Sequence, residues 1–197
     1  MRNKIIVTGA AGFIGFHVCK KLIELDQDIL GIDNINSYYE TDIKKARISE
    51  IAKKANNSDK IWEFVKVDLE EKETLKTIFK RFQPNIVVHL AAQAGVRFSI
   101  TNPDSYVKSN LVGFVNIIEL CRNFNVEHLI YASSSSVYGG NSKTPFHEND
   151  PVNHPVSLYA ATKRSNELIA HVYSHLYRIP CTGLRFFTVY GPWGRPD

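Results

Sequence analysis

The chain has 197 residues, of which 44% are hydrophobic and 22% are charged. These proportions are ordinary for a folded globular protein, and they exclude a disordered, collagen-like or coiled-coil chain. The net charge of +4 comes from 24 basic and 20 acidic residues of interleaved sign. This balance excludes the basic stripe that is typical of a nucleic-acid-binding protein.

The chain shows no sign of a membrane segment, a disulfide framework or a metal site. No apolar run approaches the ~18 residues that a membrane-spanning helix needs. The cysteines Cys19, Cys121 and Cys181 are far apart and form no CxxC pair, which argues against disulfides and against zinc. We therefore expect no contact with a membrane, no bound metal and a cytoplasmic location.

Short apolar runs alternate along the chain with stretches of helical periodicity. The runs predict strands at Lys4–Thr8, Asp28–Asp33, Trp62–Asp68, Asn85–Leu90, Glu127–Ala132 and Cys181–Phe186. The periodic stretches predict helices at Gly12–Leu25, Asp42–Lys54, Lys72–Phe82, Ser105–Phe124 and Leu158–Tyr177. Continuously apolar strands are typical of a parallel sheet that is buried on both faces. The sequence therefore predicts an α/β fold, a doubly wound, mostly parallel sheet with helices on both faces.

A glycine run follows the first predicted strand and opens the first predicted helix. Gly9, Gly12 and Gly15 have the spacing GxxGxxG. Backbone N–H groups at a helix N-terminus can bind a pyrophosphate, and glycines allow its close approach. The second predicted strand ends at Asp33, whose carboxylate can accept hydrogen bonds from an adenosine ribose and would repel a 2′-phosphate. This order predicts bound NAD rather than NADP, with a ligand-free structural turn as the alternative.

The ends of the later strands are expected to complete the cofactor site. Asp68 could meet the adenine or could simply end the third strand, and small residues after the fourth strand leave room for a cofactor to cross the sheet. The predicted cofactor-binding residues are Gly9, Gly12, Phe13, Ile14, Gly15, Asp33, Asn34, Asp68, Leu69, Leu90, Ala91, Ala92, Gln93, Tyr159 and Lys163.

Tyr159 and Lys163 are four residues apart on a predicted helix and therefore share a face. An ammonium group beside a phenol favours the phenolate, so we expect Lys163 to lower the pKa of Tyr159. Such a tyrosine can remove a proton from a hydroxyl near neutral pH. The serines Ser133–Ser136 follow the fifth predicted strand and can bring a hydroxyl beside the phenol. A serine-rich turn without a chemical role is the alternative.

Together, the glycine run, Asp33, the serine run before Val137–Gly139 and the Tyr159/Lys163 pair resemble the extended short-chain dehydrogenase/reductase family of NAD-dependent epimerases and dehydratases. The resemblance covers the entire chain. It implies that Tyr159 is the catalytic base and that Lys163 is its partner and a ribose ligand. It also implies that Ser134 is the hydroxyl that orients the substrate.

Within this family, the resemblance narrows to the UDP-glucuronate 4-epimerases. Sugar dehydratases carry Thr-Asp-Glu where this chain has Ser134–Ser136, and the decarboxylases carry Glu at the last of these positions. Without that acid, the implied reaction is 4-epimerisation: a hydride leaves C4, a 4-keto sugar forms, and the hydride returns to the other face. Segments similar to the UDP-glucuronate 4-epimerases are Asp33–Tyr39 with Lys44–Arg47, Ala91–Arg97 and Arg185–Asp197.

The resemblance also implies a set of substrate contacts. Thr188 and Arg195 would contact the C6 carboxylate of the sugar. Because four serines follow one another at Ser133–Ser136, Ser135 and Ser136 remain alternatives to Ser134 as the orienting hydroxyl. The predicted substrate residues are Ser134, Ser135, Ser136, Arg97, Thr188 and Arg195. The expected partners are a UDP-sugar and, through the helices Ser105–Phe124 and Leu158–Tyr177, a second copy in a homodimer.

The last segment of the chain, Tyr190–Asp197, has the composition of a loop. Members of the family are longer, and their C-terminal part builds most of the substrate lobe. We therefore expect residues 1–197 to form the NAD-binding Rossmann domain, with the C-terminal substrate lobe largely absent. Two alternatives to the UDP-glucuronate reaction stay open: a UDP-glucose/UDP-N-acetylglucosamine 4-epimerase, and an NAD-binding module without catalytic activity.

Overall fold

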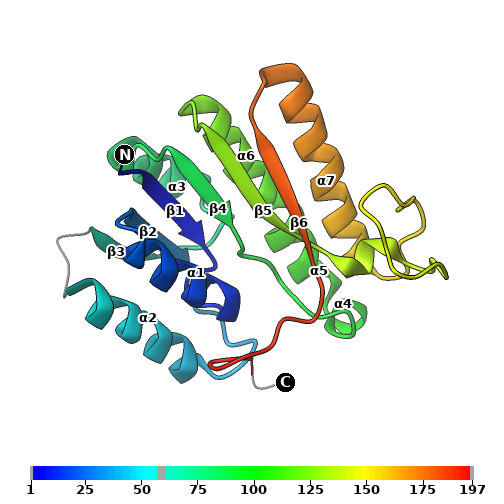
Figure 1. Cartoon of the computed structure of the whole chain (residues 1–197), viewed down its shortest axis with the longest axis horizontal. Coiled ribbons are helices and arrows are strands. Elements are labelled where there is room, and N and C mark those ends of the chain that lie inside the picture. The colour runs from blue at the N-terminus through cyan, green and yellow to red at the C-terminus, as the bar shows by residue number, and fades with distance from the viewer. Residues whose placement is uncertain (1, 57–60, 196–197) are drawn as a thin grey trace.

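The computed structural model describes residues 2–56 and 61–195, and its centre is a parallel sheet between two layers of helices (Figure 1). The described residues form six strands in the order β3-β2-β1-β4-β5-β6, and each pairing is parallel. The strands are β1 Lys4–Thr8, β2 Asp28–Asp33, β3 Trp62–Lys66, β4 Ile86–His89, β5 His128–Ser134 and β6 Cys181–Phe186. This is the Rossmann order, and the predicted fold class is confirmed.

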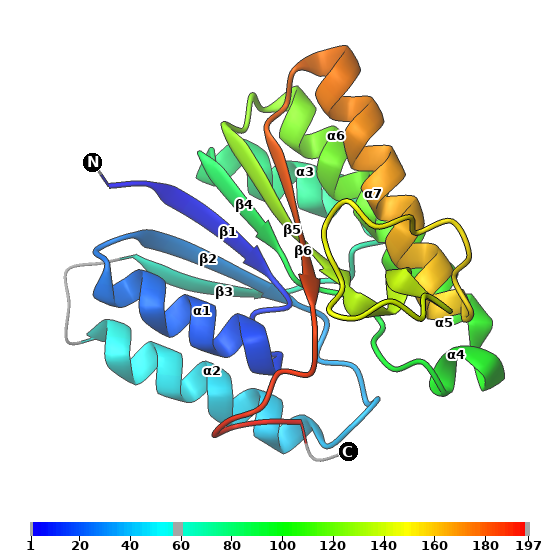
Figure 2. The same ribbon diagram turned by 45° about the vertical axis from the view of Figure 1, so that its right-hand side comes forward.

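Helices cover both faces of the sheet (Figure 2). They are α1 Phe13–Glu24, α2 Thr41–Asn56, α3 Lys72–Phe82, α4 Phe98–Thr101, α5 Pro103–Tyr106, α6 Gly113–Asn123 and α7 Leu158–Tyr177. The helices α1 and α2 lie on one face, and α3, α6 and α7 lie on the other. None of the described helices is long and apolar enough to cross a membrane.

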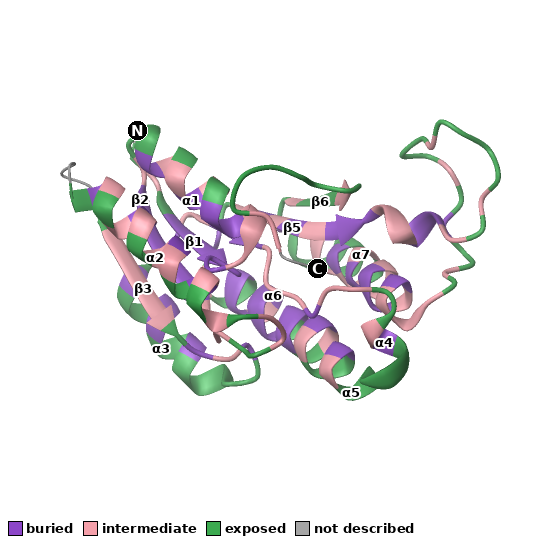
Figure 3. Ribbon diagram, turned by 90° about the horizontal axis from the view of Figure 1, so that it is seen from below, coloured by how far each residue is buried: buried purple, intermediate pink, exposed green. Residues whose placement is uncertain are grey.

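The continuous apolar run in β1 is explained by burial on both faces (Figure 3). Successive side chains of a strand point to opposite faces. Ile5 and Val7 pack with Phe16 of α1, whereas Ile6 packs with Phe114 of α6. Each fully buried side chain of this size contributes about 1.5–3 kcal/mol. The two cores hold the sheet rigid between its helices.

Several predicted elements differ from the structure by one or two residues at an end, and two differences bear on the site. The third strand ends at Lys66, so Asp68 lies just beyond it. The helix predicted over Ser105–Phe124 is helical as expected, but it begins earlier, at Pro103, and contains a π-helical segment at Val107–Val112 between α5 and α6. Apolar periodicity does not reveal a π segment, which adds one residue to a turn without changing the composition.

The strand order reverses at β1, which has β2 on one side and β4 on the other. In open α/β sheets, ligands bind in the crevice at such a switch point, beside the carboxyl ends of the strands. The segment after β6 returns across this edge toward α1 and α2 (Figure 2). The imidazole Nε2 of His17 lies 2.9 Å from the carbonyl oxygen of Pro192, and the rings of Phe16 and Trp193 are 5.3 Å apart.

Candidate active site

A cavity of about 640 Å³ opens at this switch point. Its volume is within the ~300–1,000 Å³ of small-molecule and cofactor sites. Strand ends from both halves of the sheet contribute to its wall. The whole set of residues predicted to bind the cofactor lines it: Gly9, Gly12, Phe13, Ile14, Gly15, Asp33, Asn34, Asp68, Leu69, Leu90, Ala91, Ala92, Gln93, Tyr159 and Lys163.

The glycine loop has no room for side chains. Gly9 has a φ of +73°, and a Cβ there would lie 2.7 Å from the backbone nitrogen of Ala91. A Cβ on Gly15 would lie 2.0 Å from the carbonyl oxygen of Gly9. No side chain caps the first N–H groups of α1, which begins directly after Gly12. The loop and helix therefore form a cradle that fits a pyrophosphate.

At the end of β2, the carboxylate of Asp33 is built into the glycine loop. Its oxygens accept hydrogen bonds from the backbone nitrogens of Ala11 at 3.2 Å and Ile35 at 2.8 Å. Burial raises the pKa of this carboxyl, against those hydrogen bonds and the charge of Lys44. Beside it, the Asn34 amide donates to Asp68 at 2.8 Å. Carboxylate and amide side chains therefore gather at the end of β2, beside the glycine loop.

Tyr159, Lys163 and Ser134 come together on the other side of the cavity. The Lys163 ammonium is buried and donates to the carbonyl oxygen of Ala132 at 3.0 Å, and burial lowers its pKa to about 8. Ser134 lies beside the Tyr159 phenol in the same cavity and acts to lower the pKa of the phenol. The phenol ring also makes an edge contact with Tyr106 at 6.1 Å.

The expected lowering of the pKa of Tyr159 is wrong for this structure. Burial raises the pKa of the phenol, and it outweighs the lowering effects of Ser134 and of the positive charge of Arg195. Lys163 does not lower it, because its ammonium points to the end of β5. The spacing of the pair correctly places both side chains in one cavity, but the burial of the phenol is a tertiary property.

The structure distinguishes between the four serines. Ser133 and Ser134 end β5 and line the cavity. The Ser134 hydroxyl accepts a hydrogen bond from the backbone nitrogen of Ser136 at 3.1 Å and so begins a 3₁₀ turn over Ser135–Tyr138. Ser135 and Ser136 lie in that turn and are not among the lining residues. This geometry favours Ser134 over its two alternatives as the hydroxyl that faces a ligand.

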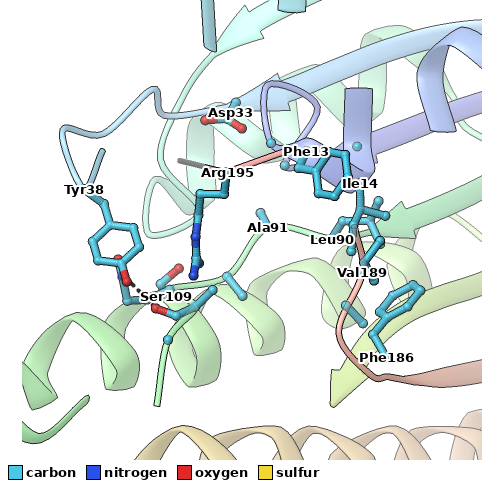
Figure 4. Close-up of a pocket in the computed structure, with 18 of the residues that line it drawn as sticks. Phe13, Ile14, Asp33, Tyr38, Leu90, Ala91, Ser109, Phe186, Val189 and Arg195 are labelled. Atoms are coloured by element: carbon cyan, nitrogen blue, oxygen red, sulfur yellow. Dashed lines mark hydrogen bonds between the residues drawn. The ribbon is translucent and has the colours of Figure 1, made fainter. Parts of the chain in front are cut away.

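The predicted substrate residues divide in the same way. Thr188 and Arg195 line the cavity, and Arg195 reaches into it from the returning segment, toward Ser109 (Figure 4). Its guanidinium carbon lies 5.6 Å from the centre of the Tyr38 ring. Arg97 is exposed at the start of α4 and does not line the cavity. The part of the last motif that follows Arg195 lies outside the described residues.

Some lining residues were missed from the sequence. Tyr38, Tyr39 and Lys44 belong to the wall, and the available signal was their place in the family-like segments Asp33–Tyr39 and Lys44–Arg47. Ser109 lies in the π-helical segment, where no periodic pattern could have indicated its direction. Among the described residues, no group of three or more His, Cys, Asp or Glu side chains could hold a metal ion.

A buried arginine joins the glycine loop to the segment that follows β6. The Arg47 side chain is fully buried. It donates to the carbonyl oxygens of Ala11 at 3.0 Å and Trp193 at 2.7 Å, and to the Tyr39 hydroxyl at 2.8 Å. A longer bond of 3.2 Å reaches Gly194. Arg47 thus connects the glycine loop to the segment that carries Arg195.

Comparisons with known proteins agree with this geometry. The family model described as NAD dependent epimerase/dehydratase family matches residues 5–197. UDP-glucuronate 4-epimerase 4 of Arabidopsis thaliana is 50% identical over 194 residues, which cover 98% of this chain and 43% of the relative.

Two crystal structures share the fold. The UDP-glucuronic acid 4-epimerase of Bacillus cereus, in complex with UDP-glucuronic acid and NAD, is 35% identical with a TM-score of 0.86, over 98% of this chain and 59% of that one. The UDP-glucose 4-epimerase of Thermotoga maritima, with UDP-glucose, is 33% identical with a TM-score of 0.83, over 98% of this chain and 58% of that one.

The chain spans about half the length of the curated relatives it matches. The matched half contains the sheet, the glycine cradle and the Tyr159–Ser134 pair, and NAD, the expected cofactor, is confirmed as the cofactor of the matched family. With the family model covering nearly every residue and the cavity built from the predicted strand ends, the chain belongs to the NAD dependent epimerase/dehydratase family.

Proposed function

We propose that this chain is the NAD-binding part of a UDP-sugar 4-epimerase whose substrate is UDP-glucuronate. The observation that carries the proposal is that one cavity contains both the glycine cradle and the Tyr159–Ser134 pair. The 50% identity to a relative named UDP-glucuronate 4-epimerase supports the choice of sugar.

The reaction divides between the cofactor and the chain. When bound in this cavity, NAD would supply the hydride chemistry, as acceptor and then donor of a hydride at C4 of the sugar. Tyr159 is placed to take the proton of the C4 hydroxyl and to give it back, so that a 4-keto sugar forms between the two steps. Burial raises the pKa of this phenol, so the base depends on the groups that act in the opposite direction, Ser134 and the positive charge of Arg195. Ser134 orients the C4 oxygen by a hydrogen bond. Neither Ser135 nor Ser136 can act as an acid near neutral pH, so elimination of water is not supported.

The preference for a uronate rests on the returning segment. An arginine and a hydroxyl suit a carboxylate, because the guanidinium fork donates paired hydrogen bonds. Arg195 and Thr188 line the cavity and would read the C6 carboxylate. A neutral-sugar epimerase acting on UDP-glucose or UDP-N-acetylglucosamine is the alternative, and the similarity to the Thermotoga maritima enzyme supports it. A module that binds NAD without catalysis is the second alternative.

The test is turnover by the 197-residue chain with NAD, supplied separately with UDP-glucuronate and UDP-glucose. Chromatography separates the C4 epimers. UDP-galacturonate from the first sugar alone supports the proposal, and conversion of UDP-glucose alone supports the neutral-sugar enzyme. If neither sugar reacts while NAD still binds, the chain is a binding module. Tyr159→Phe is the matched control, because it removes only the reacting hydroxyl.

We also propose a homodimer, supported by an apolar stripe on α7. Leu168, Val172 and Leu176 are 52%, 48% and 60% exposed and are spaced four residues apart, so they share a helix face. Light scattering on the eluting protein should give twice the 22.4 kDa chain mass. A Val172→Glu variant that elutes as a monomer would support this face, and a parent chain that is already monomeric would contradict it.

A further inference from the structure

Three successive turns of α7 hold three successive residues of β5. Tyr159 and Ser134 line the same cavity, where Ser134 acts to lower the pKa of the phenol, and Lys163 donates to the carbonyl oxygen of Ala132. One turn further on, Glu167 accepts a hydrogen bond from the Ser133 hydroxyl at 2.6 Å. Residues at i, i+4 and i+8 of a helix share a face. The pair proposed for proton transfer therefore lies at one end of a continuous contact between helix and strand.

Glu167 is the charged centre of this contact. Its carboxylate also accepts two hydrogen bonds from Arg185 of β6, at 2.9 and 3.0 Å, and one from Arg164 at 2.9 Å. Its side chain is only 11% exposed. Burial acts to raise the pKa of Glu167, but the hydrogen bonds from Arg185, Ser133 and Arg164 outweigh it and lower the pKa.

The strand register explains why Glu167 reaches both strands. Ser133 of β5 lies directly opposite Arg185 of β6, so both side chains meet the same carboxylate. The bidentate fork of an arginine constrains a carboxylate in angle as well as in distance. The end of β5 is thereby held between α7 and β6, one residue before Ser134.

We propose that Glu167 is a positioning residue for the proton-transfer pair: by holding Ser133 and Arg185, it sets the approach of Ser134 to Tyr159. The inference rests on the proposed function, because it assigns a purpose to this pair. A displacement of about 1 Å in such a pair can lower a rate ~100-fold. Glu167 itself does not line the cavity.

The test compares Glu167→Gln and Ser133→Ala with a control, Glu119→Gln. Glu119 accepts hydrogen bonds from Tyr173 at 2.6 Å and Arg122 at 3.3 Å, so the control also loses a carboxylate that joins two helices, but away from the cavity. The expected result for both test variants is a kcat about 10- to 100-fold lower, with KM changed less than ~3-fold. A similar loss in Glu119→Gln would overturn the proposal.

A second readout does not need turnover. The pKa of Tyr159 can be followed by ¹³C NMR of labelled tyrosine Cζ and assigned with Tyr159→Phe. The groups that face this phenol are Ser134, Arg195 and Tyr106. Because Ser134 acts to lower the pKa of Tyr159, a displaced Ser134 should raise that pKa further in Glu167→Gln and Ser133→Ala. An unchanged Tyr159 pKa in both variants would overturn the proposal.

A double variant tests whether Ser133 and Glu167 affect the rate through the contact between them. If Ser133 acts through Glu167, the pair Glu167→Gln/Ser133→Ala should be no slower than Glu167→Gln alone, whereas fully additive losses contradict the shared contact. Ser133→Ala keeps the Arg185 fork, so it remains informative if Glu167→Gln does not fold. If the parent turns over no sugar, the proposed function fails, but the Tyr159 pKa comparison still decides this inference.

Discussion

Replacing Gly15 by alanine would test the contact between α1 and the glycine loop. The added Cβ would lie 2.0 Å from the Gly9 carbonyl oxygen, 2.8 Å from the Gly9 carbonyl carbon and 3.0 Å from the Ala10 Cα. An ordinary contact begins at 3.4 Å, so α1 would have to move away from the loop by about 1.4 Å. All three neighbours are backbone atoms and cannot rotate aside. Overpacking of this kind costs about 1–3 kcal/mol of unfolding free energy.

The same displacement should weaken NAD binding at least ~10-fold, because the N–H groups of the cradle move away from the pyrophosphate. Gly140→Ala is the matched control, since an added Cβ there meets no atom within 4 Å. It should leave stability unchanged or raise it by up to about 1 kcal/mol. Urea unfolding and calorimetric titration with NAD measure both effects. A Gly15→Ala variant that unfolds and binds NAD like the parent would refute the reasoning.

Asp33→Asn should reduce the preference for NADH over NADPH in fluorescence titrations, because it removes the charge that repels a 2′-phosphate; an unchanged ratio would contradict this role. Lys163→Met should change how stability depends on pH. The folded pKa of Lys163 is about 8 against an ordinary 10.5, so the cost of burying its charge is complete below pH 8 and is relieved as the pH rises toward 10.5. From pH 8 to pH 10.5, the unfolding free energy of the parent, measured with urea, should rise relative to that of Lys163→Met. Parallel pH profiles of the two unfolding free energies would argue against a buried ammonium. Arg47→Lys should lower the unfolding free energy by about 2–3 kcal/mol, because an ammonium cannot make all four hydrogen bonds. The control Lys45→Ala, at an exposed position two residues earlier in α2, should stay within about 0.5 kcal/mol. Urea unfolding measures both variants.

Most of the sheet could be predicted because each strand is a local apolar run. The bounds of β1, β2 and β6 match the prediction, as do those of α3 and α7. The glycine loop and Asp33 were also predictable, since strand, glycines, helix and acid follow one another within 33 residues. The fold, the glycine loop and Asp33 could therefore be predicted because each depends on residues that are close together in the sequence.

The remaining features depend on contacts between distant segments. The Ser133–Glu167 and Arg185–Glu167 bonds join residues 34 and 18 positions apart, and no spacing rule connects them. The direction of the Tyr159 pKa follows from burial by several elements at once. Ser109 faces the cavity from a π-helical segment, and the one-residue change of register there leaves no trace in the hydrophobic pattern.

The position of β6 has a practical consequence for handling the protein. This strand pairs with β5 along one edge, and the described residues supply no strand for its other edge. Thr182, Gly183 and Leu184 are exposed there. The backbone N–H and C=O groups of an unpaired strand edge are a template for pairing with another chain. Concentrated solutions of the 197-residue chain should therefore form aggregates that grow by strand addition, and a lysine in place of Leu184 should suppress them without touching the cavity.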